Sequence, residues 1–457
     1  MTVKTRILQL ITSIRFQRLG REFFWICLGQ GAAVLGGLVG VRILTELLEP
    51  EAYGQLALGM TVATLVNQVV TGPLSSGVTR FYAPAQEAGT LHAYLTAVRG
   101  MVLTSTGGII LVALLTGGGL VLAGQSQWMG LGVAALCFAL PSGYNSILNG
   151  IQSAARQRTI VALHQGLASW GRFLVAAWLM LWLGATSTVA MLGYGLTMLI
   201  VLASQYVFFG RILKSVGNEE AAGTRTNNHQ WRTRVFTYSW PFATWGIFSW
   251  AQQVSDRWAL GLFSSTQEVG LYAVLFQLGY YPISLLTDLV VTLVKPVFFQ
   301  RAGDATDGQR MEKVNLLNRW LTWFSLGLTI LGFLVAFVFS DFVFHIFVAP
   351  EYSEVAHLLP WMLLSGGIFA SGQIISINYM NQLKSKALIA PKIATAALGI
   401  CLNILGAKLY GINGIVVASV AFSVVFFVWM LFGSRKHVNA LRLLEESREG
   451  KNKTDFT

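Results

Sequence analysis

Residues 235–262 (VFTYSWPFATWGIFSWAQQVSDRWALGL) and residues 269–294 (VGLYAVLFQLGYYPISLLTDLVVTLV) are two long apolar runs joined by a short polar turn. Each has about the length that an α-helix needs to cross a bilayer. Both carry polar residues at helical spacing, which are Tyr238, Trp245, Ser249, Gln252 and Asp256 in the first and Gln277, Tyr281, Ser284, Asp288 and Lys295 in or just after the second. A helix surrounded by lipid gains nothing from such a stripe. The pattern therefore predicts two membrane helices whose polar faces turn towards a shared interior.

The composition of the whole chain agrees with this class. Of its 457 residues, 54% are hydrophobic and only 11% are charged, whereas a soluble globular chain is about 25% charged. Three cysteines (Cys27, Cys137 and Cys401) lie far apart inside apolar runs, a pattern that predicts neither disulfides nor a metal site. The sequence predicts an all-α integral membrane protein without a bound metal.

Twelve apolar runs are expected to form membrane helices, some with internal Gly and Pro that neighbouring helices tolerate. They lie near residues 23–44, 54–73, 95–116, 129–148, 162–183, 189–209, 235–258, 271–294, 319–339, 358–382, 392–409 and 415–432. A basic amphipathic segment, residues 1–22, precedes them and is expected to lie on the inner membrane surface. In the first run, Gly36 and Gly40 form a small-residue face suited to close helix packing.

The basic residues give the orientation. Every Lys and Arg except Arg42, Arg172, Arg257 and Lys408 lies at a terminus, in an even-numbered connection or at the adjoining end of a run. The odd-numbered connections hold acidic residues instead. This positive-inside pattern places both termini in the cytoplasm of a cell whose inner (plasma) membrane holds the chain. It also explains the net charge of +12 without a nucleic-acid partner.

The chain divides into two similar halves. A polar, basic linker at residues 210–234 separates a first lobe, residues 23–209, from a second lobe, residues 235–432, which is followed by a cytoplasmic tail, residues 433–457. After the first span of each half comes an arginine, then an acidic turn, then a Gly/Tyr pair (Tyr53 and Gly54 in one half, Gly270 and Tyr272 in the other). With six spans per half, equivalent spans keep one orientation, as in the parallel repeats of transporters.

Several short stretches point to a known group of proteins. They are residues 42–54, residues 77–82 (GVTRFY), residues 149–156 (NGIQSAAR), Asp256-Arg257 and residues 270–273 (GLYA). In order and spacing the chain resembles the multidrug/oligosaccharidyl-lipid/polysaccharide (MOP) exporter superfamily, and within it the polysaccharide-biosynthesis and O-antigen-type flippases. It departs from their usual pattern at residues 386–411, where only Asn403 remains of an expected asparagine-rich helix.

The resemblance implies two six-helix lobes around a central cavity that opens alternately to each side. It also implies a substrate, an undecaprenyl-diphosphate-linked oligosaccharide that is moved from the cytoplasmic to the outer leaflet. Such a transporter uses no cofactor, and a proton or cation gradient is a candidate energy source. Membrane lipids, a polysaccharide polymerase and glycosyltransferases are the partners that this function suggests.

Arg172 is the sharpest candidate for binding the diphosphate. It lies about ten residues, or roughly 15 Å, into the fifth span, near the expected midplane. A cation at that depth is costly unless it faces a wet cavity or a partner, and guanidinium suits phosphate oxygens. A structural ion pair with Asp288, or a side chain that reaches towards the interface, stays open as an alternative.

The remaining candidates have equally open alternatives. Arg42, Asp256 and Arg257 lie at the outer ends of spans 1 and 7, where they could bind substrate, close a gate between lobes, or be ordinary helix-end charges. Gln68, Gln252 and Asn378 could bind sugar hydroxyls or bond neighbouring helices, and Trp245 is the candidate for sugar stacking. Asp288 is a candidate proton or cation site, or a partner of Lys295.

Other function classes fit less well. A cation-coupled multidrug exporter of the same superfamily is the main alternative, but its cationic drugs favour acidic cavity residues, whereas the deepest charge here is Arg172. A membrane enzyme needs a sizeable outer loop, and no outer loop here exceeds about twenty residues. No nucleotide-binding loop is present. A membrane scaffold would not need the polar stripes.

Overall fold

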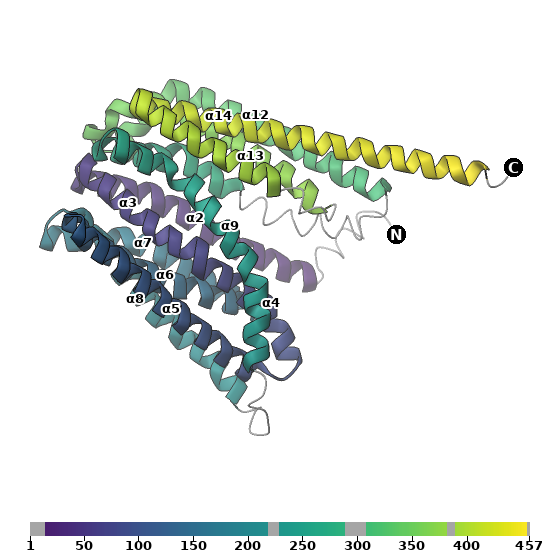
Figure 1. Cartoon of the computed structure of the whole chain (residues 1–457), viewed down its shortest axis with the longest axis horizontal. Coiled ribbons are helices and arrows are strands. Elements are labelled where there is room, and N and C mark those ends of the chain that lie inside the picture. Colours follow the sequence, from purple (N-terminus) through teal and green to yellow (C-terminus); the bar gives the residue numbers. More distant parts are fainter. Residues whose placement is uncertain (1–13, 218–227, 288–307, 382–388, 455–457) are drawn as a thin grey trace. The chain divides into compact units, whose positions relative to one another are not determined.

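The computed structural model describes residues 14–217, 228–287, 308–381 and 389–454, and within those ranges the regular structure is helical (Figure 1). The chain forms two compact units, Met1–Arg257 and Trp258–Thr457. The boundary between them lies within one helix, α9 (Asn228–Phe263). Helix is also present at both ends of the predicted linker, since α8 ends at Gly217 and α9 begins at Asn228. The predicted lobe boundaries stay a prediction.

The described part of unit 1 holds seven α-helices before α9, together with one π-helix and one 3-10 turn. They are α2 (Ile14–Leu47), α3 (Pro50–Val66), the π-helix η1 (Asn67–Thr71), α4 (Gly72–Glu87), α5 (Leu91–Leu122), the 3-10 turn η2 (Ser126–Trp128), α6 (Met129–Ala154), α7 (Arg158–Leu183) and α8 (Ser187–Gly217). The closest pairs are α6 with α8, α7 with α8 and α2 with α7. Helix α6 also packs against α4 and α3, so α6 and α8 together hold the described part of unit 1.

The small-residue face predicted on the first span is where α2 meets α7. A Cβ on Gly36 would touch the indole of Trp170 at 3.1 Å, and a Cβ on Gly40 would overlap the ring of Phe173. Trp170 Nε1 also donates to the carbonyl oxygen of Ala32 at 3.0 Å. Small residues here let α7 approach closely and hold Phe173, next to Arg172, in a fixed place.

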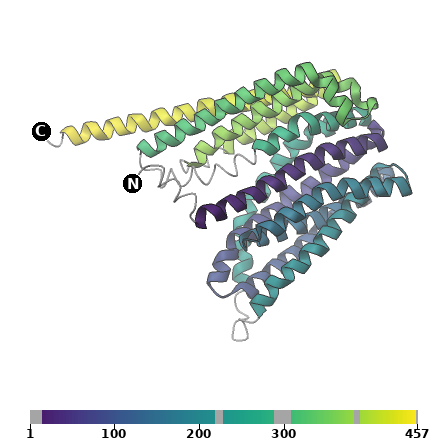
Figure 2. The same cartoon turned by 180° about the vertical axis from the view of Figure 1, so that it is seen from behind.

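Unit 2 is built from the end of α9 and the helices that follow. They are α10 (Thr266–Leu275), the π-helix η3 (Phe276–Tyr280), α12 (Gly308–Phe347), the 3-10 helix η4 (Pro350–Leu358), α13 (Leu359–Asn381) and α14 (Ile389–Thr454). Helix α13 packs against α12 on one side and α14 on the other, and the three run side by side in both views (Figure 2). Helix α14 contains a kink at Gly411, whose backbone is not helical.

Nine helices in the described ranges are long and apolar enough to cross a membrane. One of them, residues 393–433, covers both of the last two predicted spans, because the kink at Gly411 falls between them. The first predicted span lies in α2 and the seventh in α9, and neither is among the nine. The chain is thus a multi-pass helical membrane protein.

The two units repeat two structural details. A π-helix interrupts the second predicted span at η1 and the eighth at η3. In unit 1, Ser187 Oγ at the start of α8 donates to Gln55 Oε1 of α3 at 2.8 Å. In unit 2, the Ile412 backbone N–H, just after the kink, donates to Glu268 Oε2 of α10 at 2.7 Å. Each unit therefore ties the start of its second predicted span to the start of its sixth, as an internal repeat would.

Candidate functional site

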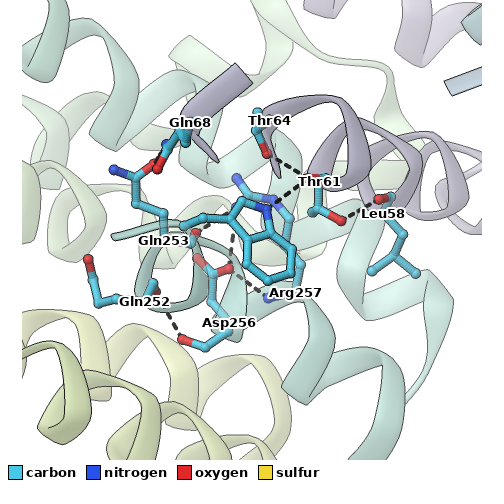
Figure 3. A network of polar contacts seen from close by, with 10 residues as sticks. Leu58, Thr61, Thr64, Gln68, Gln252, Gln253, Asp256 and Arg257 are labelled. Atoms are coloured by element: carbon cyan, nitrogen blue, oxygen red, sulfur yellow. Dashed lines mark hydrogen bonds and ion pairs between the residues drawn. The ribbon is translucent and has the colours of Figure 1, made fainter. Parts of the chain in front are cut away.

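Polar side chains link α3 and η1 to α9 inside unit 1 (Figure 3). Gln68 Nε2 donates to Gln253 Oε1 at 2.6 Å, and Trp250 Nε1 donates to the carbonyl oxygen of Thr61 at 2.8 Å. Gly246 makes the approach possible, because a Cβ there would overlap the backbone oxygen of Gln68. These residues form what we call the α3–α9 seam.

The π-helix η1 places Gln68 in this seam. A π turn inserts an extra residue into a helix and turns the following side chains to a new direction, which is why such turns are frequent at functional sites. Gln68 and Gln253 have side chains that solvent reaches, so their hydrogen bond is accessible to a polar ligand.

Asp256 and Arg257 lie at the end of the seam and pair with each other. Asp256 is 5% exposed. Its Oδ1 accepts from the Arg257 backbone N–H at 2.7 Å and lies 3.3 Å from Arg257 Nη1. Arg257 Nη1 also donates to the carbonyl oxygen of Gln253 at 3.3 Å. The negative charge of Asp256 is therefore largely offset by the positive charge of Arg257, and the pair carries little net charge.

Arg172 has a different environment. It is half-buried on α7, with its guanidinium carbon 4.5 Å from the centre of the Phe173 ring and 5.9 Å from that of Tyr194. Its Nε is buried without a hydrogen-bond partner, and no carboxylate of the described residues pairs with it. Aromatic faces stabilise such a cation by about 2 kcal/mol when it is desolvated, but they leave its N–H groups able to bind an anion.

Tyr53 connects Arg172 to the seam. It lies in the first turn of α3, is 8% exposed, and its hydroxyl feels the charges of both Arg172 and Arg257. Tyr194, on α8, is 4% exposed, and the centre of its ring lies 5.9 Å from the guanidinium carbon of Arg172. Two cations and two phenol groups thus gather in unit 1 from α3, α7, α8 and α9.

The other predicted residues lie as follows. Arg42 forms an ion pair with Glu46, one turn on in its own helix, and the gate between lobes stays a prediction. Trp245 is 42% exposed on α9. Gln252 is half-buried, and its backbone oxygen accepts from Ser255 Oγ at 2.9 Å. The side chain of Asn378, in α13, and the whole of Asp288 lie outside the described residues.

The sequence stripe missed Trp250 and Gln253. The predicted stripe contains Trp245, Ser249 and Gln252. The residues of α9 that contact α3 and η1 are their next neighbours in the chain, Gly246, Trp250 and Gln253. Each contacting residue is therefore shifted by one position, or about 100° around the helix axis, from the stripe residue before it. The stripe was predicted from polarity alone, whereas the face of α9 that contacts α3 is set by the close backbone approach at a glycine. Gly246 was the residue in the sequence that could have indicated this face.

None of the described His, Cys, Asp and Glu residues gather in a group of three that could hold a metal ion. The charged groups of unit 1 that are buried or half-buried near the seam are cationic or paired, as Arg172 and the Asp256–Arg257 pair show. The arrangement can hold an anion and hydrogen-bond a polar group beside it.

Cysteine labelling tests whether the α3–α9 seam is wet. We expect Thr64→Cys and Gln252→Cys to react with a membrane-impermeant thiol reagent, because both residues are half-exposed beside the seam. Leu114→Cys is the control, since Leu114 is an apolar residue of α5 that is 69% exposed in the structure and is expected to face lipid. Labelling at Leu114 alone, in folded protein, would contradict a wet seam.

The sequence profile of a family described as "Polysaccharide biosynthesis protein" matches residues 19–301, more than half of the chain. The chain belongs to the polysaccharide biosynthesis protein family. The matched region contains unit 1 from residue 19, inside α2, onward, including Arg172, Tyr53 and the α3–α9 seam. The comparison with curated proteins gives no match.

Solved structures show the fold of this polysaccharide biosynthesis family member. An inward-facing multidrug resistance MATE transporter of the MOP superfamily is 12% identical, covers 90% of this chain and 95% of its own, and has a TM-score of 0.65. The lipid II flippase MurJ in an inward closed conformation is 13% identical, with 90% and 87% covered and a TM-score of 0.65. A MOP superfamily transporter from Pyrococcus furiosus is 15% identical, with 92% and 95% covered and a TM-score of 0.59. The fold is therefore that of MOP transporters.

Proposed function

We propose that this protein is a flippase that moves undecaprenyl-diphosphate-linked oligosaccharide units from the cytoplasmic to the outer leaflet by alternating access, without enzymatic activity of its own. Membership of the polysaccharide biosynthesis family supports the substrate class. The likeness to MurJ supports a lipid-linked cargo for this fold.

The observation that carries the proposal is the environment of Arg172. A diphosphate loses its hydration when it enters a membrane protein, so the path needs fixed cations whose charge no carboxylate cancels. Arg172 meets that requirement among the described residues, because aromatic rings hold it and its Nε has no hydrogen-bond partner. Arg257 and Arg42 are proposed as further contacts for the head group, which would take the place of their present carboxylate partners, Asp256 and Glu46.

The sugar part of the cargo needs hydroxyl-binding and stacking groups. Gln68, Gln252, Asn378 and Trp245 are proposed for this role. The hydrogen bond between Gln68 and Gln253 supports it, because amides that bond each other in an accessible seam can exchange that bond for one to a sugar hydroxyl.

The proposed architecture has twelve spans in two lobes, residues 23–209 and 235–432, in the inner membrane with both termini cytoplasmic. The distribution of basic residues supports the orientation. The matching ties Ser187–Gln55 and Glu268–Ile412 support two related lobes. Asp256 and Asp288 are proposed for gating or for coupling to a proton or cation gradient. Glycosyltransferases and a polysaccharide polymerase are the proposed partners, and no cofactor is needed.

Multidrug resistance MATE transporters share this fold, so a cation-coupled multidrug exporter is the alternative function. Such a protein binds cationic drugs, which calls for an uncancelled carboxylate. The buried carboxylate of the seam, Asp256, is instead held by Arg257, whereas the uncancelled charge at Arg172 is positive. The positive sign of the uncancelled charge at this site favours an anionic cargo.

Deletion followed by lipid extraction tests the proposal. We expect a deletion strain to accumulate undecaprenyl-diphosphate-linked oligosaccharide in the cytoplasmic leaflet and to lose surface polysaccharide, with both effects reversed by the wild-type gene. Drug susceptibility is measured in the same strains. If the amount of lipid-linked saccharide is unchanged and drug sensitivity rises in the deletion strain, the flippase proposal is wrong and the multidrug exporter is the better assignment.

A further inference from the structure

Two of the motifs that resemble flippases lie against each other in unit 1. Residues 77–82 (GVTRFY) belong to α4, and residues 149–156 (NGIQSAAR) form the end of α6 and the turn after it. Gly150 permits the contact, because a Cβ there would lie 2.5 Å from Thr79 Oγ1. One turn earlier, Ser75 Oγ donates to the carbonyl oxygen of Ser146 at 3.0 Å. The contacts advance together along both helices, so α4 and α6 run parallel and end at the same side of unit 1.

The start of α9 packs against the first of these motifs. The centre of the Phe81 ring lies 6.4 Å from that of Trp231 and 5.7 Å from that of Tyr238, and a Cβ on Gly77 would overlap a side chain of α9. Arg234 lies about one turn from both Trp231 and Tyr238 in α9, and its guanidinium carbon is 5.2 Å from the centre of the Trp231 ring. Both motifs and the first turns of α9 therefore meet at one end of unit 1.

Each of these three elements contributes one exposed arginine. They are Arg80 of α4, Arg156 after α6 and Arg234 of α9. In α4, Arg80 lies between Thr79, which meets α6, and Phe81, which meets α9, so it occupies the exposed face of α4 between those helices. None of the described carboxylates pairs with any of the three arginines. Their positive charges are thus not cancelled within the described chain.

The backbone at Arg156 has a conformation that favours glycine. Its φ is 61°, and no other described non-glycine residue has a positive φ. The Arg156 N–H donates to the carbonyl oxygen of Ser153 at 3.1 Å and the Gln157 N–H to that of Gln152 at 2.8 Å, which is the helix ending that usually carries glycine at this position. An arginine here is strained. Strain of this kind clusters at ligand sites, which supports a role for the guanidinium.

The three guanidinium groups fit a diphosphate. Each offers a planar fork of N–H donors that matches phosphate oxygens, and the two phosphoryl groups of a diphosphate can engage more than one fork. The proposed orientation places this end of unit 1 at the cytoplasmic surface, where basic side chains attract phosphate groups of the inner leaflet. The proposed cargo begins its path in that leaflet.

We propose that Arg80, Arg156 and Arg234 form a loading site, which receives the diphosphate of the lipid-linked cargo before it reaches Arg172. This inference rests on the proposed function. It also gives the two motifs a role, because their glycines bring α4, α6 and α9 together and their arginines bind the head group.

Binding of undecaprenyl diphosphate to the purified protein in phosphatidylcholine nanodiscs tests the site. One variant combines Arg80→Gln with Arg234→Gln, and the control combines Arg99→Gln with Arg211→Gln, which removes the same charge from exposed arginines of α5 and α8. We expect the first variant to bind about tenfold more weakly or worse, and the control to bind as the wild type does. Unchanged binding in the first variant, or equal weakening in both, would overturn the site. Displacement by an equal amount of phosphatidylglycerol would show a general anionic-lipid surface and would also overturn it.

Arg156→Gly separates charge from structure. Glycine relieves the strain and removes the guanidinium, so we expect the apparent melting temperature to rise while binding of undecaprenyl diphosphate falls. A lower melting temperature with unchanged binding would show a structural role and remove Arg156 from the site.

Surface polysaccharide in a deletion strain distinguishes this proposal from the proposed function. We expect Arg80→Gln with Arg234→Gln to restore it only weakly at equal protein amount. If this variant restores it as well as the wild-type gene does, the loading site is wrong and the proposed function stands. If deletion changes neither surface polysaccharide nor lipid-linked saccharide, the proposed function is wrong.

Discussion

Replacing Arg172 by Ala is expected to abolish transport of the lipid-linked saccharide while the protein still inserts and folds. The guanidinium is the uncancelled cation of the described site, and aromatic rings rather than a carboxylate hold it. Its removal leaves the diphosphate without a charge-assisted partner at this point of its path. A buried contact of this kind is worth about 2–5 kcal/mol, which corresponds to a roughly tens- to thousands-fold loss of rate.

Two further substitutions of Arg172 are expected to reduce transport to different extents. Arg172→Lys keeps the charge but loses the planar fork and the stacking on Phe173, so we expect partial transport. Arg172→Glu places a carboxylate where the diphosphate must pass, so we expect the greatest loss. The order Lys, Ala, Glu follows if charge and geometry both matter, whereas a packing role would rank the variants by size.

The measurement is surface polysaccharide restored to a deletion strain, normalised to the amount of protein in the membrane. Arg211→Ala is a matched control, because Arg211 also lies over a ring, 4.9 Å from the centre of Phe208, but is exposed near the end of α8. We expect this variant to transport normally. Wild-type polysaccharide from Arg172→Ala would show that Arg172 is not a substrate contact.

Replacing Gly411 is expected to destabilise unit 2 more than any other single alanine substitution discussed here. Gly411 has φ 56° and ψ −133°, a conformation essentially limited to glycine that costs other residues about 1–3 kcal/mol. A Cβ at this position would also lie 2.6 Å from Oε2 of Glu268. That carboxylate accepts from the Ile412 backbone N–H, so alanine would both strain the backbone and displace the group that caps the following helix segment.

The two contributions can be separated with controls from the same chain. Gly89 has φ 64° with open space around it, and Gly132 has neither strain nor a neighbour within 4 Å. We expect Gly132→Ala to leave the apparent melting temperature of the purified protein unchanged, Gly89→Ala to lower it modestly, and Gly411→Ala to lower it most. Glu268→Ala should lower it as well, and should soften the effect of Gly411→Ala in the double variant. A melting temperature for Gly411→Ala equal to that for Gly89→Ala would show that the Glu268 contact contributes nothing.

The sequence by itself determined the membrane class, because apolar runs of bilayer length and a low charged fraction admit no soluble fold. It also determined the close packing at Gly36 and Gly40 and the presence of a cation deep in the fifth span. These features depend on composition and spacing along one helix, and a single sequence displays both. The order of the short motifs was enough to point to the polysaccharide-biosynthesis proteins, which the family profile confirms, and the solved structures show the expected fold.

Only the tertiary structure decided which faces meet. Helical periodicity placed Gln252 on a polar stripe, but the close approach at Gly246 brings Gln253 and Trp250 to α3 instead. The gathering of Tyr53 and Tyr194 around Arg172 joins residues of α3, α7 and α8, and the bond between Gln152 and Gln205 joins α6 to α8. A periodic pattern fixes the angle of a side chain about its own helix axis; which neighbour it meets depends on backbone approach and on π turns, and those arise only when the helices pack.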